Sequence, residues 1–191
     1  MTTHIKPALL MLLIFTLLTG IVYPLAVTFS AQLLFPSQAN GSLLGTKEQP
    51  LGSELIGQAF SSPEYFWGRP SATSPVPYNG GASSGSNQGP TNPALIASVK
   101  ARIKALRDVN PSQLEAVPVD LVTASASGLD PHISPAAAKY QISRVAIVRH
   151  LSPNSVSDLV DRYTEGRQWR ILGEPRVNVL ELNLALDQHL K

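Results

Sequence analysis

An uncharged stretch runs from Pro7 to Thr46, and within it residues 8–34 (ALLMLLIFTLLTGIVYPLAVTFSAQLL) are almost continuously apolar. A helix needs roughly 20 apolar residues to cross the hydrocarbon core of a bilayer. A cleaved signal peptide has a shorter apolar region, of about 7 to 15 residues, that ends at a small-x-small site. Here the best candidate site, Phe29-Ser30-Ala31, begins with a bulky ring. The sequence therefore predicts an uncleaved transmembrane helix.

The distribution of basic residues predicts the orientation of this helix. Lys6 and the terminal amine lie on one side of the apolar run, and the next basic residue is Lys47. Basic residues that flank a span stay on the cytoplasmic side. We expect residues 1–7 to be a cytoplasmic tail, residues 8–34 the transmembrane helix and residues 35–191 one soluble extracytoplasmic domain. A single helix cannot enclose a pore, so any transport role requires partner subunits.

The charge and the missing ligand motifs exclude several classes of function. The net charge is +2, and the basic residues are scattered without interleaved aromatics, unlike the footprint of a nucleic-acid-binding protein. The sequence has no cysteine, no Gly-rich phosphate loop and no closely spaced histidine pair. We expect no nucleic-acid partner, no metal site and no covalently bound cofactor.

Helical spacing of apolar residues predicts three helices in the soluble domain, each opened by a capping residue and a proline. The starts are Thr91 or Asn92 before Pro93, Ser134-Pro135 and Ser152-Pro153. The first helix should end near residues 109–111, and Gly166 should stop the third.

The second of these helices is predicted to bury one stripe of side chains. Gln141 borders this stripe, whereas Arg144 and Arg149 are expected to point elsewhere. The members of the stripe are Ala138, Ile142, Val145 and Val148.

Short strands are predicted over residues 52–60, over the β-branched run 118–123, and from residue 176, where a strand should run into a short helix by residue 187. The aromatic cluster 65–67 is expected to anchor the core.

Residues 70–93 carry no charge and are rich in Pro, Gly, Ser and Asn, which favours a loop, either mobile or ordered by turn hydrogen bonds. The predicted fold class is α/β: a single N-terminal transmembrane helix followed by one mixed α/β extracytoplasmic domain.

A concentration of reactive side chains follows the predicted strand at 118–123. Ser125, Ser127, Asp130 and His132 are the residue types of serine-hydrolase catalysis, which places a nucleophile on a base that a carboxylate orients. The Gly-x-Ser-x-Gly elbow is absent, and the Asp-Pro-His sequence equally suits a turn. A membrane-anchored extracytoplasmic serine hydrolase is therefore the alternative hypothesis, and a solitary solute-binding module is a third.

Several motifs of this chain carry a family resemblance that covers essentially its whole length. The most specific is VPVDLVTASASGLDPHISP at 117–135. The others are 57–58, FWGRPSA at 66–72, 78–79, 85–87, 92–93, 136–137, 141–146 and 177–183. In these motifs the chain resembles the C subunit of the Kdp potassium-transporting P-type ATPase.

The resemblance implies an accessory, non-catalytic subunit of a high-affinity, ATP-driven potassium uptake complex in the bacterial inner membrane. Its partners would be a P-type ATPase subunit, which is phosphorylated on its own aspartate, and a channel-like subunit that binds potassium. The family's C subunit is credited with stabilising the assembly and, as a catalytic chaperone, with raising the affinity of the ATPase subunit for ATP. Gln141 matches the glutamine implicated in nucleotide contact, so ATP is the ligand that the resemblance implies.

Two arguments from the residues bear on these roles. The predicted orientation places Gln141 outside the cytoplasm, whereas a P-type pump takes ATP from inside, and the alternative for Gln141 is a side chain that pairs with backbone at the edge of the core. Thr16 and Gly20 form a small-xxx-small step that permits close helix packing, next to a kink expected at Pro24. The full set of predicted partner contacts is Thr16, Gly20, Tyr78, Asn79, Asn87, Asn92, Ser125, Ser127, Asp130 and His132.

Overall fold

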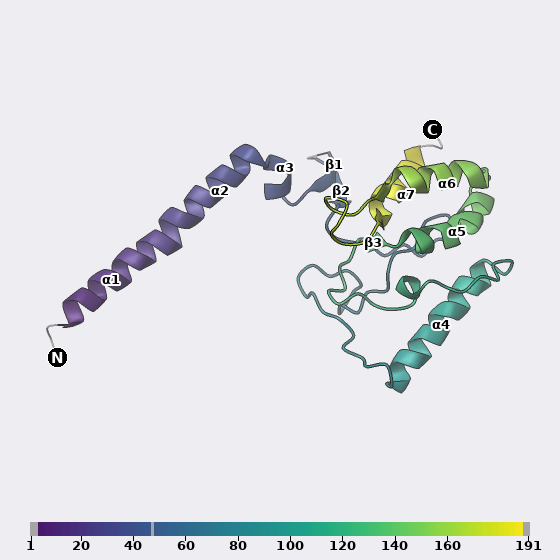
Figure 1. Ribbon diagram of the computed structural model, residues 1–191, viewed down its shortest axis with the longest axis horizontal. Coiled ribbons are helices and arrows are strands. Elements are labelled where there is room, and N and C mark those ends of the chain that lie inside the picture. The colour runs from purple at the N-terminus through teal and green to yellow at the C-terminus, as the bar shows by residue number, and fades with distance from the viewer. Residues whose placement is uncertain (1–3, 47, 189–191) are drawn as a thin grey trace. The chain divides into compact units, whose positions relative to one another are not determined.

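The computed structural model describes residues 4–46 and 48–188. The chain divides into two compact units, Met1–Pro50 and Leu51–Lys191. Figure 1 shows the helices and strands of both units.

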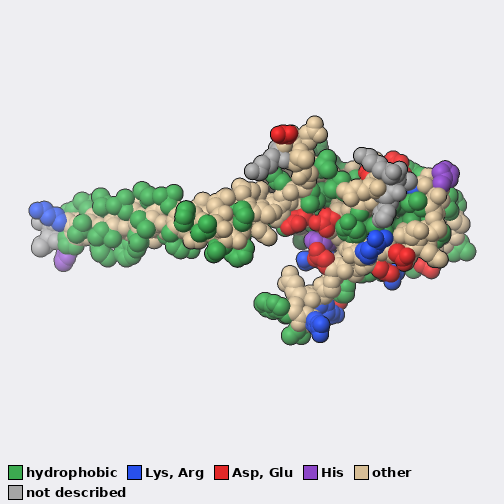
Figure 2. Space-filling view, turned by 90° about the horizontal axis from the view of Figure 1, so that it is seen from above, with side chains coloured by type: hydrophobic (Ala, Val, Ile, Leu, Met, Phe, Trp, Pro, Cys, Tyr) green, Lys and Arg blue, Asp and Glu red, His purple; other side chains and the backbone are tan. Residues whose placement is uncertain are grey.

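The first unit is dominated by the predicted membrane helix. Helix runs without interruption from Ile5 to Leu34, 30 residues, through α1 (Ile5–Leu17), the π-helical turn η2 (Leu18–Val22) and α2 (Tyr23–Leu34). Hydrophobic side chains cover the face seen in Figure 2, and no residue of the helix is buried by protein. The helix is thus long and apolar enough to cross a bilayer, and it begins three residues earlier than position 8.

The π-helical turn lies where a proline interrupts the hydrogen-bond ladder. Pro24 has no N–H to donate to the carbonyl of Gly20, and the backbone widens in the turn before it. Within this turn, the Thr19 hydroxyl donates to the Phe15 carbonyl at 2.6 Å. Thr16 therefore lies beside, and Gly20 within, an irregular segment of the helix. The unit continues with α3 (Pro36–Ala39) and β1 (Leu43–Gly45).

The second unit combines helices with a small antiparallel sheet. The sheet has the strand order β3-β5-β4, with β5 in the centre. Since its strands are antiparallel, the fold mixes helix and sheet without the parallel βαβ units that the term α/β implies. The elements are β2 (Pro50–Ser53, at the division between the units), α4 (Pro93–Val109), the 3₁₀ turn η3 (Val119–Leu121), β3 (His132–Ile133), α5 (Pro135–Val148), α6 (Pro153–Arg162), β4 (Thr164–Glu165), β5 (Arg176–Asn178) and α7 (Val179–Gln188).

All three predicted helix starts in this unit are confirmed. Asn92 accepts from the Ala94 N–H at 2.9 Å, Ser134 from Ala137 at 3.0 Å and Ser152 from Ser155 at 3.0 Å. Each cap satisfies one of the N–H groups that a helix start leaves without a partner, and the proline that follows has no N–H to lose.

The end of the third predicted helix differs from expectation. It stops at Arg162, and β4 intervenes before Gly166.

Two of the predicted strands are wrong in whole or in part. Residues 118–123 contain the 3₁₀ turn η3 (Val119–Leu121) in place of a strand. The Asp120 carboxylate accepts from the Ser134 N–H at 2.7 Å, and the Thr123 hydroxyl donates to the Val119 carbonyl at 2.7 Å. These contacts override the β propensity of the run. The strand expected over 52–60 is only β2, since a turn follows Ser53. The third strand is confirmed: β5 runs directly into α7.

The core of the second unit lies where α5, α6 and α7 pack together with β5. Figure 1 shows the three helices close to one another. Phe66 is completely buried in it, which confirms the expected role of the aromatic cluster. The largest fully buried apolar side chains are Phe66, Val145, Val156, Val160, Val177, Leu182 and Leu186.

Replacing Leu182 by alanine tests this description of the core. Leu182 has no exposed surface, so Leu182→Ala should leave a cavity and lower the free energy of unfolding by about 2–5 kcal/mol. The control Leu114→Ala alters a side chain that is 91% exposed and should change it by less than about 0.5 kcal/mol. Urea unfolding of the full chain in detergent measures both. Equal effects of the two substitutions would contradict this core.

Candidate functional site

Two side-chain amides hold the aromatic segment Pro63–Trp67 between α5 and α7. Asn183, on α7, accepts from the Phe66 N–H at 2.9 Å and donates to the Phe66 carbonyl at 3.0 Å. Gln141, on α5, does the same for Trp67, accepting at 2.8 Å and donating at 3.1 Å. Each amide thus satisfies both backbone groups of one residue in a segment that has no strand partner.

Arg144 completes this arrangement. Its guanidinium donates to Gln141 Oε1 at 2.7 Å, to the Tyr65 carbonyl at 2.9 Å and to the Pro63 carbonyl, and it lies 4.7 Å from the centre of the Trp67 ring. It is 3% exposed and has no carboxylate partner among the residues described. Burial lowers the pKa of Arg144 to about 10, so the side chain still carries its charge at neutral pH.

Arg149 anchors the same segment one turn further along. It donates to the Glu64 carbonyl at 2.7 Å and to the Asp187 carboxylate at 2.7 Å, and it lies 4.7 Å from the centre of the Tyr65 ring. The expectation that Arg144 and Arg149 point away from the core is wrong.

The predicted buried stripe of α5 is wrong at one further position. Val148 is 43% exposed, whereas Gln141 and Arg144 belong to the buried face. Gln141 and Arg144 follow the buried residues Ala137 and Ala138 at helical spacing, and this spacing was the only sequence signal for their burial. Their polarity argued against burial.

Gln141 is therefore a buried structural amide in this conformation. Its side chain is 1% exposed, and besides Trp67 it contacts Arg144 and donates to the Ala137 carbonyl at 3.2 Å. Its amide oxygen and nitrogen both have partners within the protein. A nucleotide could reach this carboxamide only if the Trp67 segment moved.

The uncharged loop and the 125–132 motif, predicted separately as contact surfaces, are joined to each other. The Ser71 hydroxyl donates to the Gly128 carbonyl at 2.7 Å, and the Ser83 hydroxyl donates to the Ser127 carbonyl at 3.0 Å. A side chain at Gly128 would place its Cβ 2.7 Å from the Ser84 carbonyl oxygen, in a backbone with φ of +67°. Turn hydrogen bonds also occur within the loop, where the Ala82 N–H donates to the Asn79 carbonyl and the Gly81 N–H donates to Asn79 Oδ1, both at 3.0 Å. The loop is thus ordered, one of the two alternatives that composition left open, by contacts to the motif as well as by turns.

Tyr78 and Asn79 belong to the same network. The Tyr78 hydroxyl donates to the Arg69 carbonyl at 2.5 Å, and burial raises the pKa of Tyr78 to about 12. Asn79 uses its backbone N–H to reach the Thr73 hydroxyl at 3.0 Å. Both residues thus hold the loop through hydrogen bonds to residues earlier in the same segment.

Asp130 is the charged centre of the motif. Its Oδ2 accepts from Arg69 at 3.0 Å and its Oδ1 accepts from the His132 N–H at 3.0 Å, while His132 Nδ1 lies 3.5 Å from Oδ1. Partial burial by itself raises the pKa of Asp130, but the hydrogen bonds from His132 and Arg69 and the charge of Arg69 outweigh it and hold the pKa below its usual value. Asp130 is therefore ionised at neutral pH.

The motif does not assemble a hydrolytic triad. Ser125 is buried and accepts from the Gly128 N–H at 2.9 Å, and Ser127 accepts from the Leu129 N–H at 3.1 Å. Within the described part of the chain neither serine is hydrogen-bonded to His132. The serines and Asp130 build turns, as the structural alternative proposed.

The structure thus brings together six of the predicted contact residues in the second unit: Tyr78, Asn79, Ser125, Ser127, Asp130 and His132. Of the other two in this unit, Asn92 caps α4, and Asn87 is an exposed residue with φ of +52°. Thr16 and Gly20 belong to the helix of the first unit.

Two cavities of the second unit bear on its binding chemistry. One, of about 290 Å³, lies between Trp67, Arg69, Tyr78 and Arg102. Burial lowers the pKa of Arg102, which donates to the Val122 carbonyl at 2.8 Å.

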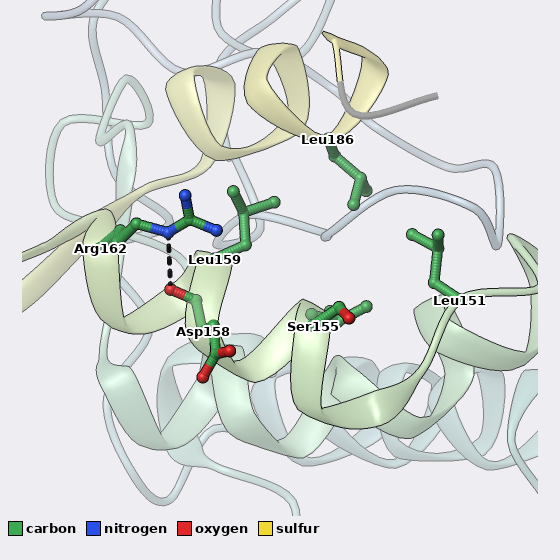
Figure 3. A pocket seen from close by; sticks show the side chains of 7 residues that line it. Leu151, Ser155, Asp158, Leu159, Arg162 and Leu186 are labelled. Atoms are coloured by element: carbon green, nitrogen blue, oxygen red, sulfur yellow. Dashed lines mark hydrogen bonds between the residues drawn. The ribbon is translucent and has the colours of Figure 1, made fainter. Parts of the chain in front are cut away.

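The other cavity, of about 330 Å³, lies between α6 and α7 (Figure 3). Leu151, Leu159 and Leu186 face its interior, and Arg162 donates to the Asp158 carbonyl at 3.2 Å. It contains no pairing of a nucleophile with a base. Among the described residues no cluster of His, Asp or Glu is arranged to hold a metal ion.

Comparison with known proteins identifies the family. The family described as "KdpC: K+-transporting ATPase, c chain" matches residues 5–188. The chain is 68% identical over 187 residues to the potassium-transporting ATPase KdpC subunit of Methylococcus capsulatus, with 98% of each chain covered. It is 60% identical to the KdpC subunit of Dechloromonas aromatica, again with 98% of each chain covered. The family match extends over the helix of the first unit and over the second unit as far as residue 188, and the chain therefore belongs to the KdpC family of K+-transporting ATPase c chains.

Proposed function

We propose that this chain is the accessory, non-catalytic subunit of an ATP-driven potassium uptake complex in the bacterial inner membrane. The observation that carries the proposal is the family match over residues 5–188, which includes both the membrane helix and the second unit. Its partners are a P-type ATPase subunit and a channel-like, potassium-binding subunit, and the reaction with ATP takes place on the former. The turns built by Ser125, Ser127 and Asp130 support a binding role over hydrolysis.

The role that the structure supports best is stabilisation of the assembly. The apolar helix α1–α2 packs in the bilayer, where Thr16 and Gly20 allow a partner helix to approach. The second unit presents a surface whose shape is fixed by internal hydrogen bonds, and Asn87, Asn92, His132 and the loop around Tyr78 are its candidate contacts. A pre-ordered surface loses less conformational entropy when it binds.

Co-purification tests this role directly. The complex is expressed with and without this chain, and the partner subunits are purified in mild detergent. We expect the chain to co-purify, and its omission to reduce potassium-stimulated ATP hydrolysis at least tenfold. Full activity of a complex that lacks the chain would contradict the proposal.

We further propose that the second unit lies outside the cytoplasm, on the basis of the charge asymmetry around the membrane helix. Cysteines at His4 and Leu114 can report on this, because the chain has no other cysteine and both positions are exposed. In cells with a permeabilised outer membrane, an impermeant maleimide should label Leu114→Cys and not His4→Cys. The reverse pattern would place the second unit in the cytoplasm.

For ATP, we propose that Gln141 acts as a positioning residue, so that any effect of this chain on ATP affinity is transmitted through the assembly. Gln141→Ala would leave the Trp67 backbone groups and one Arg144 donor without partners, and it should lower the free energy of unfolding by about 3 kcal/mol. The control is Lys139→Ala on the same helix, whose side chain is 60% exposed. In complexes that retain the Gln141→Ala chain, the KM for ATP should stay within twofold of the wild-type value. A tenfold higher KM with unchanged stability would establish direct nucleotide contact instead.

The lowered pKa of Asp130 predicts how acid affects stability. A carboxyl group whose pKa is lower in the folded state stabilises the fold above its unfolded pKa, near 3.8, and this contribution is lost as the pH falls through the folded value. Asp130→Asn should therefore lower the Tm at pH 7, with a difference from wild type that shrinks below about pH 4. Asp108→Asn, in an exposed ion pair with Lys104, should have little effect at any pH. A constant difference between pH 7 and pH 3 would contradict the assignment.

A further inference from the structure

The segment Arg167–Glu174 between β4 and β5, here called the 167–174 hairpin, exposes an unusual set of apolar side chains. Trp169 is 85% exposed, Ile171 74% and Leu172 52%. No other four-residue stretch in the described part of the second unit exposes three large hydrophobic side chains. Single exposed apolar residues need no explanation, but a contiguous group marks a surface that is covered by something else.

The backbone of this hairpin is closed and braced. Gln168 and Leu172 exchange both of their backbone hydrogen bonds at 2.9 Å, and the Ile171 N–H donates to the Gln168 carbonyl at 3.1 Å. At the base, the Arg167 guanidinium contacts both carboxylate oxygens of Glu174 at 2.7 Å. The apolar side chains are thus presented from an ordered turn.

This turn also holds two residues in an unfavourable backbone conformation. Trp169 has φ of +50° and Arg170 has φ of +65°, in the left-handed region that non-glycine residues rarely adopt. Each such residue costs on the order of 1 kcal/mol. The conformation closes the hairpin, but the three large apolar side chains that it displays remain in solvent.

The nature of the partner follows from rigidity and charge. The hydrogen bonds of the hairpin hold its backbone in one conformation, which lowers the conformational entropy lost when the hairpin enters a protein pocket of matching shape. Trp and Arg are also the residues most enriched among those that dominate protein interfaces. Arg170 has no ion pair within the described residues, so it is free to meet a carboxylate at the rim of such a pocket.

We propose that the 167–174 hairpin docks into an apolar, acid-rimmed pocket on another subunit of the potassium-transporting ATPase complex. The proposal rests on the function proposed above. Three side chains bury too little area for a stable interface alone, which needs about 800 Å² on each partner. The membrane helix supplies a second attachment, and the link between the two makes docking of the hairpin an intramolecular step with a high effective concentration.

Cysteine accessibility tests where the hairpin lies in the assembled complex. Ile171→Cys is compared with the control Leu114→Cys, which is also exposed and apolar, by the rate at which an impermeant maleimide adds mass to this chain. We expect labelling of Ile171→Cys to be at least tenfold slower in the complex than in the chain alone in detergent, and that of Leu114→Cys to change less than twofold. Equal rates at residue 171 would overturn the proposal. Two other results would also overturn it. Slow labelling of residue 171 in phosphatidylethanolamine–phosphatidylglycerol vesicles without partners would assign the hairpin to lipid. Labelling that slows as the concentration of the chain alone rises would assign the hairpin to contact with a second copy.

A variant pair separates docking from folding. Trp169→Ser/Ile171→Ser and Arg170→Glu should each reduce the amount of chain recovered with the partner subunits at least tenfold after a detergent wash, while Leu114→Ser should not. The Tm of each variant chain alone should match that of the wild type, because the altered side chains are exposed. If the wild-type chain itself fails to co-purify, the proposed function fails. If the wild type and both hairpin variants co-purify equally, only the docking proposal fails.

Discussion

The second unit depends on a buried charge that has no counter-charge among the described residues. Moving a guanidinium out of water costs several kcal/mol unless its donors are satisfied, and Arg144 is satisfied only by the carbonyls of Pro63 and Tyr65, the amide oxygen of Gln141 and the face of the Trp67 ring. All of these groups belong to one segment or hold it in place. A path of the aromatic segment that removed the Pro63 and Tyr65 carbonyls would leave buried guanidinium donors of Arg144 without acceptors, so Arg144 favours the observed conformation of residues 63–67.

That conformation also fixes the path of the next residues in the chain. Arg69 follows Trp67 two positions later in the chain. Its guanidinium pairs with Asp130, and its carbonyl accepts a hydrogen bond from the Tyr78 hydroxyl. The loop after Pro70 then attaches to the turn around Gly128 through Ser71. A segment without helix or strand therefore connects the helical core to the most family-specific motif. The same chain of contacts explains why a long loop rich in Gly and Ser is ordered here, although such loops are often disordered.

This architecture fits a subunit that binds and positions. The groups that could perform chemistry, Ser125, Ser127, Asp130 and His132, are used to shape turns, and Gln141 is used to hold the backbone. The exposed features are of another kind: an apolar helix long enough to cross a bilayer and a braced hairpin with a Trp at its tip. Together they fit the proposed role of a subunit that one helix anchors in the membrane and whose second unit makes a further contact with its partners.

The sequence by itself determined the membrane helix, the three capped helix starts, the burial of Phe66 and the family. Each of these rests on a local rule or a contiguous motif: an uncharged apolar run, an Asn or Ser followed by Pro, a cluster of aromatics. Only the tertiary structure decided that Arg144 and Arg149 turn inward, because carbonyls some 80 residues away in the sequence satisfy them. It also placed a 3₁₀ turn at Val119–Leu121, where a strand was predicted, since Asp120 accepts a hydrogen bond from Ser134 at the start of α5, and it left Trp169 in solvent. Polarity and β propensity are averages over many environments, and at these positions contacts between distant segments outweigh them.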